Sequence, residues 1–258
     1  EVNANTLLIF FNFHTAVLPI LILLLMAYHF WSVRKVGGIM LPKKVDEKKM
    51  IPVYPNLVYR EFIVALALIA VVLTFSVFFN APLLAKANPD VSINPTKAPW
   101  YFAGIQELLM HFHPFVAAFL IPFAIVFALA YLPYLKLKDE PSGIWFHSGK
   151  GKEAAKFSVI IATVITTLLV IINEFIPDFE TLLPWLNPFI SNGVLPLLII
   201  LALLWYYYKY ITKKFKLDFI EVIQTMFLFV TTCFIILTLI GIFFRGVDMA
   251  LTFPWNVL

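Results

Sequence analysis

The chain has 258 residues, of which 62% are hydrophobic and only 13% are charged, and its mean hydropathy is +0.91. So apolar a composition lies outside the range of soluble domains and predicts a membrane protein. The net charge of +4 comes from basic residues gathered in loops between apolar segments, so it gives no support to a nucleic-acid partner.

Six apolar segments follow one another, each long enough for a tilted helix that crosses a bilayer. They cover residues 6–33, 59–84, 113–135, 157–177, 193–211 and 219–244. Proline-rich stretches at 39–55, 80–99 and 177–196 lie between them and are predicted to be connecting loops. The expected fold is all-α, a polytopic transmembrane helical bundle of about six spans.

The chain begins with Glu1 and enters its first apolar segment almost at once, without a basic leader. This start predicts a processed or truncated end rather than a signal peptide. Cys233 is the single cysteine, so no disulfide forms within the chain and no cysteine metal cluster is expected. Its place in an apolar run favours a packed or lipid-facing side chain.

Basic residues predict the orientation of the spans, because Lys and Arg near span ends prefer the cytoplasmic side. Most of them fall in the loops after spans one, three and five: Arg34, Lys35, Lys43, Lys44, Lys48, Lys49, Arg60, Lys136, Lys138, Lys150, Lys152, Lys156, Lys209, Lys213, Lys214 and Lys216. Lys86, Lys97 and Arg245 are left for the opposite side. Both termini are therefore expected on the outer, positive side of the membrane.

His14 and His29 lie fifteen residues apart in the first apolar segment. In a regular helix they would be about 22 Å apart and within about 60° of one face. An ionisable residue inside a span is costly and is a functional candidate, and neutral imidazole is a common axial ligand of heme iron. On spacing alone, two histidines that merely reach the headgroups remain an alternative.

The residues around this pair resemble a known family. Residues 14–19, 28–30 and 33–42 are similar to the fourth helix of the chloroplast-type cytochrome b and its bacterial relatives. Residues 94–102 contain Pro99-Trp100-Tyr101 and look like the quinol-site motif Pro-Glu-Trp-Tyr of cytochrome b. The chain thus resembles cytochrome b of the quinol:cytochrome c oxidoreductase family, from its fourth helix onward, closest to the split form with its subunit IV.

The resemblance implies two parts: a heme-binding helix with the start of an inner loop at 1–43, and a subunit-IV-like membrane domain at 44–258. His14 would bind the iron of the outer b-type heme and His29 that of the inner one. Arg34 and Lys35 would hold heme propionates or a quinone, with ordinary span-end anchors as the alternative. The other axial ligands would come from a partner chain or segment that carries the family's first three helices, because His111, His113 and His147 are better explained as interfacial.

The outer loop at 80–112 would hold the quinol site, with Pro99, Trp100 and Tyr101 against the substrate. The family's motif glutamate is Pro99 here, so Glu107, seven residues beyond Trp100 and expected near the same helix face, would accept the quinol proton. In this replacement the chain resembles menaquinol-using relatives more than ubiquinol-using ones, which implies menaquinol as the substrate. The alternatives are an interfacial aromatic belt for Trp100 and Tyr101, and a solvated carboxylate for Glu107.

The function implied is a Q-cycle, in which quinol oxidised at the outer face sends electrons to a Rieske iron–sulfur protein and through two hemes. A c-type cytochrome, lipid and a homodimeric complex are the other expected partners. The resemblance also implies a bacterial cytoplasmic membrane or an equivalent energy-transducing membrane as the location. Two alternatives are a six-span transporter or proton channel lined by His14, His29, Glu107 and Glu174, and a diheme quinol-oxidising anchor without a Q-cycle. Glu174 and Asp178 are expected to be surface carboxylates, with proton exit as the other interpretation, and the last three spans to be plain membrane helices.

Overall fold

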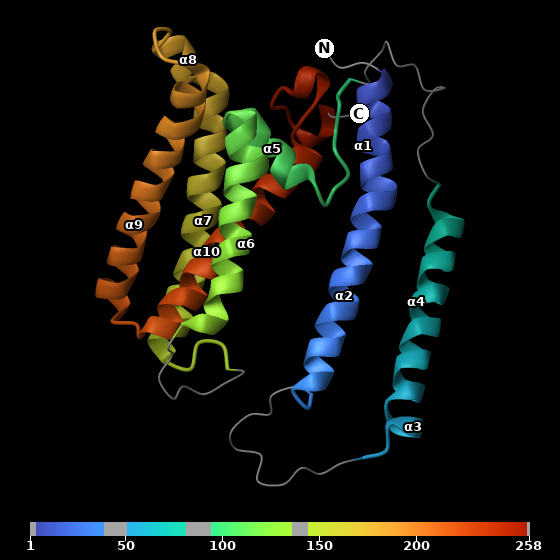
Figure 1. Cartoon of the computed structure of the whole chain (residues 1–258). Helices are drawn as coiled ribbons and strands as arrows, with labels where there is room; N and C mark the ends of the chain where they lie inside the picture. Colours follow the sequence, from blue (N-terminus) through green and yellow to red (C-terminus); the bar gives the residue numbers. More distant parts are fainter. Residues whose placement is uncertain (1–3, 39–50, 81–93, 136–143, 257–258) are drawn as a thin grey trace. The chain divides into compact units, whose positions relative to one another are not determined.

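The structure, a computed structural model, describes residues 4–38, 51–80, 94–135 and 144–256 (Figure 1). Regular structure in these ranges is helical, apart from an isolated bridge between Arg245 and Leu251. Six helices are long and apolar enough to cross a membrane, which confirms the all-α expectation and the number of spans. They are Leu8–Lys35, Val53–Phe78, Val116–Tyr134, Gly149–Phe175, Ile190–Phe215 and Phe219–Phe243.

The chain packs as two units, Glu1–Leu83 and Leu84–Leu258. In the first, α1 (Ala4–Asn12) continues through a π-helical turn into α2 (Leu18–Lys35), and α3 (Val53–Asn56) precedes α4 (Val58–Phe78). No side chain that the structure describes in this unit is buried. The apolar surfaces of α2 and α4 are therefore left uncovered within their own unit.

Three π-helical turns share one cause. They span Phe13–Val17, Val116–Leu120 and Ile190–Val194, and in each the next residue donates its N–H to the carbonyl five residues back. A proline stands two residues after every one of these turns, at Pro19, Pro122 and Pro196. Proline has no N–H to give and its ring crowds the preceding turn, so the helix widens there by one residue.

The second unit is a helical bundle whose main contact joins α7 and α10 (Figure 1). Its elements are α5 (Ala103–His111), α6 (Ile121–Tyr131), a 3-10 turn at Leu132–Tyr134, α7 (Gly149–Phe175), α8 (Phe179–Leu182), α9 (Leu195–Phe215), α10 (Phe219–Phe243) and 3-10 turns at Val247–Met249 and Pro254–Asn256. Small side chains recur every four residues on the buried face of α7, at Ala154, Ser158, Ala162 and Thr166. This face lets α10 lie close against α7 along their length.

Helix α5 lies against the last turns of α10. A Cβ atom on Gly104 would come within 2.8 Å of the ring of Phe234, and one on Gly241 within 3.0 Å of the Ala103 carbonyl oxygen. The two helices thus approach so closely that glycine is needed on both sides. This contact fixes the residues that precede α5 relative to the end of α10.

The boundaries of several spans differ from the sequence expectation, most of all those of the second and fourth spans. Helix α7 begins at Gly149, well before residue 157, because the Ser148 hydroxyl accepts the N–H of Gly151 and caps the helix. Helix α4 ends at Phe78, and Phe79 is already extended, whereas the apolar run continues to residue 84, with 81–84 outside the described residues.

Candidate functional site

His14 lies inside the first π-helical turn and His29 in the second half of α2. Both side chains are exposed, and among the described residues no hydrogen bond or ion pair engages either imidazole. The His29 ring packs at a tilt against the ring of Phe30. Two free imidazoles on an uncovered helix fit the axial ligation of two hemes, whose other ligands would come from outside this unit. The offset of about 60° assumed a regular helix, and the wider turn at His14 alters it.

Arg34 and Lys35 form the last turn of α2, where cations complement the helix dipole. The ammonium of Lys35 lies over the Trp31 ring, 5.1 Å from its centroid. Both side chains are exposed. They are close in sequence to His29 and free to meet an anionic group beside it.

Trp100 and Tyr101 lie in the turn before α5, and their rings pack edge to face, 5.6 Å apart. Trp100 is 69% exposed and Tyr101 56% exposed. The helix begins only at Ala103, so Trp100 lies outside it and the expected spacing of two helical turns from Trp100 to Glu107 does not apply. The aromatic pair stands open, whereas Glu107 points into the bundle.

Three sets of hydrogen bonds hold the motif residues 94–99 in place. Gln106 of α5 accepts the Ala98 N–H at 2.7 Å and donates to the Thr96 carbonyl at 2.6 Å. Lys97 donates to the Ile242 carbonyl at the end of α10, 3.0 Å away, and burial lowers its pKa. Asn94 exchanges two hydrogen bonds with Asp248. The motif is therefore held by hydrogen bonds to α5, to the end of α10 and to the segment that follows α10, and we refer to these bonds as the clasp.

Glu107 is 1% exposed and meets the fully buried Arg245. Arg245 Nε donates to both carboxylate oxygens, at 3.2 and 3.1 Å, and its Nη1 donates to Glu174 Oε2 at 2.7 Å and to the Met249 carbonyl at 3.0 Å. The alternative of a solvated Glu107 is therefore wrong. We refer to Glu107, His111, Asn173, Glu174 and Arg245 as the Arg245 cluster.

The remaining bonds of this cluster orient His111. Asn173 Nδ2 lies 2.8 Å from His111 Nδ1, and His111 Nε2 lies 3.1 Å from Glu107 Oε1. Since the amide nitrogen is a donor, Nδ1 accepts and Nε2 donates to the carboxylate. His111 is thus a member of a partly buried network that includes Glu107 and Arg245, rather than simply an interfacial residue. His113 accepts the Phe115 N–H and packs beside the ring of Phe189.

Electrostatics favour charged partners in the cluster. Burial alone would raise the pKa of Glu107, but hydrogen bonds from His111 and Arg245, together with the charge of Arg245, hold that pKa below its ordinary value. Burial likewise opposes the charge of Arg245, yet its bonds to Glu107 and Glu174 raise its pKa. Glu107 is therefore an anion locked to a cation, and a weaker proton acceptor than an unpaired buried carboxylate would be.

Glu174 and Asp178 differ from each other. Glu174 accepts from Arg245 and from the Leu251 N–H, so it is a bonded member of the cluster rather than a plain surface carboxylate. Asp178 is exposed and caps α8 by accepting the Thr181 N–H at 2.9 Å. Hydrogen bonds from Thr181 and Asn192 lower the pKa of Asp178. Only Asp178 matches the expectation of a surface carboxylate.

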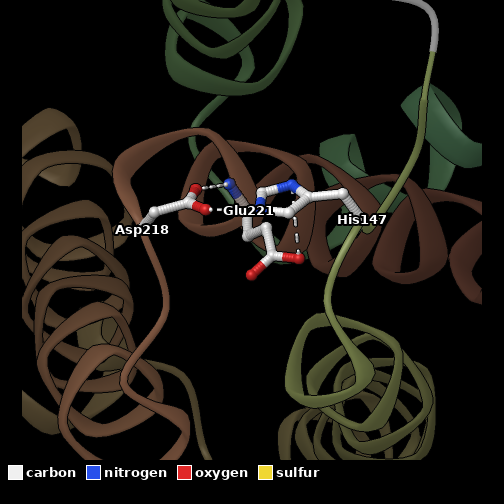
Figure 2. A group of neighbouring side chains, drawn as sticks. All are labelled: His147, Asp218 and Glu221. Atoms are coloured by element: carbon white, nitrogen blue, oxygen red, sulfur yellow. Dashed lines mark hydrogen bonds and ion pairs between the residues drawn. The ribbon is translucent and has the colours of Figure 1, made fainter. Parts of the chain in front are cut away.

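A second polar group lies where α7 and α10 begin (Figure 2). His147 Nε2 is 3.0 Å from Asp218 Oδ2, and Glu221 accepts from the Ser148 N–H and hydroxyl at 2.8 and 2.9 Å. His147, Asp218 and Glu221 offer ligand atoms within 4.8 Å of one another. However, the remaining carboxylate oxygen, Asp218 Oδ1, accepts the Glu221 N–H and caps α10. Every carboxylate oxygen of this group therefore already has a partner within the protein. We assign this group to helix capping.

Residues 1–99 match the family model described as cytochrome b(N-terminal)/b6/petB. The match includes His14, His29 and the motif residues up to Pro99. No curated protein and no solved structure matches the chain. The match supports a cytochrome b-type membrane domain, which implies electron transfer and b-type heme.

Proposed function

We propose that the chain is the part of a cytochrome b-type subunit, from the fourth helix onward, that oxidises quinol in a quinol:cytochrome c oxidoreductase. The observation that carries this proposal is the pair His14 and His29, fifteen residues apart on an uncovered helix inside the region of the family match. Bound hemes would carry electrons across the membrane. The protein side chains would ligate the iron, orient the substrate and receive protons.

The uncovered first unit supports a partner that supplies the remaining heme ligands. Neither α2 nor α4 has a buried side chain among its described residues, although both are apolar along their length. A chain or segment that carries three further helices, as in the split form of the family, would cover them. Arg34 and Lys35 would then pair with heme propionates or a quinone on the inner, positively flanked side.

The quinol site would lie at Pro99, Trp100 and Tyr101, on the outer side. An open aromatic pair suits the flat ring of a quinol, and the clasp by Gln106 and Lys97 keeps that pair in one place. Menaquinol, a Rieske iron–sulfur protein and a c-type cytochrome complete the proposed Q-cycle within a homodimeric complex in a bacterial energy-transducing membrane. Tyr101 would contact the substrate, and Glu107 would act as the proton acceptor through its neighbour His111.

A heme assay of the purified complex tests the proposal. We expect a reduced-minus-oxidised spectrum of b-type heme, and the loss of one heme in each of the variants His14→Ala and His29→Ala. His147→Ala is the matched control, because His147 belongs to a helix cap, and it should keep both hemes. Full b-type absorbance in both ligand variants would reject the heme assignment, and wild-type complex that transfers no electrons from a naphthoquinol would reject quinol oxidation.

A further inference from the structure

Arg245 lies where three segments of the second unit meet. It stands two residues after α10 and reaches Glu107 on α5 and Glu174 near the end of α7. Its side chain is fully buried, and its donors meet two carboxylates and the Met249 carbonyl. The planar guanidinium suits this task, because its fixed fork of N–H groups bonds two carboxylates at once.

The ionised state of Glu107 depends on Arg245. The titratable or charged side chains that face it are His111 from its own helix, Glu174 from α7 and Arg245 from the segment after α10. Among the described members of the cluster, Arg245 is the permanent cation and two carboxylates oppose it. A buried carboxylate that loses its cation takes up a proton more readily, because burial penalises the charged form.

The end of α10 and the segment after it also hold the motif residues in place. Lys97 bonds the Ile242 carbonyl and Asn94 bonds Asp248, so the motif is tied on both sides of Arg245. Gln106, the neighbour of Glu107 in α5, bonds residues 96 and 98. Movement of α5 away from Arg245 would therefore pull on the residues that present Trp100 and Tyr101.

We infer that Arg245 is a positioning residue for the proposed quinol site: it orients Glu107 as a carboxylate beside His111 and fixes α5 under the motif. This inference rests on the proposed function, and it assigns a role in the site to the segment after α10, which lies outside the family match. Arg245 touches neither quinol nor heme in this role.

The test is the rate at which a short-chain naphthoquinol reduces b-type heme in the purified complex, followed by stopped-flow absorbance from acid to alkaline pH. In Arg245→Gln we expect unchanged heme content, a rate at neutral pH lower by about tenfold or more, and a rising limb of the pH profile shifted to higher pH. Arg245→Lys keeps the positive charge but loses the planar set of N–H donors of the guanidinium. Its rate should therefore lie between that of the wild type and that of Arg245→Gln.

The double variant Glu107→Gln/Arg245→Gln tests whether Arg245 acts by positioning Glu107 or only by balancing its charge. It also removes both charges of the pair, so it can be measured if the single variant fails to assemble. If Arg245 acts through Glu107, the double variant stays as slow as Glu107→Gln. A wild-type rate in the double variant, or a wild-type rate and pH profile in Arg245→Gln, would overturn the inference. Absence of heme reduction in the wild-type complex would instead overturn the proposed function, and the inference with it.

Discussion

Arg245 and Glu107 form a buried ion pair although 138 residues separate them in sequence, with Arg245 Nε 3.2 and 3.1 Å from the two carboxylate oxygens. The pair joins the helix after the quinol-like motif to the end of the last spanning helix. A contact of this kind ties the proposed site to the last spanning helix, which lies outside the family match.

Glu107→Gln should slow quinol oxidation without loss of heme and should also destabilise the fold. Removing one partner of a buried ion pair costs about 3–5 kcal/mol, and we expect the lower end because Glu174 still balances Arg245. Thermal unfolding of the purified complex, followed by circular dichroism, measures the second effect. Glu153→Gln, which changes an exposed carboxylate on α7, is the matched control and should leave both quantities unchanged.

Acid should weaken the second unit through the same pair. The pKa of Glu107 is lower in the fold than its ordinary value of 4.5, so its ionisation stabilises the fold fully above that pH. The contribution is lost as the pH falls from about 4.5 through the folded pKa. We expect the midpoint of thermal unfolding to drop over this range by less in Glu107→Gln than in the wild type. An equal drop in both proteins would show that carboxylates other than Glu107 cause the loss of stability in acid.

Local patterns in the sequence predicted the helices well, but their ends less well. Long apolar runs identify the six spans because a bilayer crossing demands them. The sequence pattern predicts Lys150, Lys152 and Lys156 in a loop, yet they lie in α7, since Ser148 caps the helix before them. A charged first turn is compatible with a helix when a cap satisfies its free N–H groups.

The Arg245 cluster could not be predicted in the same way. His14, His29 and the Pro99-Trp100-Tyr101 motif are local patterns, whereas Glu107, Glu174 and Arg245 come together only through packing of α5 and α7 against α10. One signal was present: Arg245 follows an apolar helix on the side that holds few basic residues, so it needed a partner. The interpretation of the last three spans as plain membrane helices overlooked it.

Gln106→Met should loosen the motif while preserving the heme. Methionine is similar in length but cannot accept the Ala98 N–H or donate to the Thr96 carbonyl. Because misplaced substrate contacts reduce rates steeply, we expect the ratio kcat/KM for a naphthoquinol to fall by about tenfold, mostly through a higher KM. Gln224→Met, which changes a glutamine bonded to residues 144 and 146 at the other end of the unit, is the control. Equal kinetic effects of the two substitutions would argue against a role for the clasp.

Gly151→Ala should destabilise the start of α7, and Gly149→Ala should not. A Cβ atom on Gly151 would overlap the buried carboxylate of Glu221, whereas one on Gly149 meets nothing within 4 Å. Forcing Glu221 aside breaks its bonds to Ser148, and we expect a loss of about 1–3 kcal/mol, visible as a lower midpoint of thermal unfolding. Alanine at Gly149 should be neutral or slightly stabilising, because it only removes the backbone freedom of glycine. If the clash with Glu221 is the cause, Gly151→Ala should cost far less in a Glu221→Ala background, and a full, additive loss there would contradict the explanation.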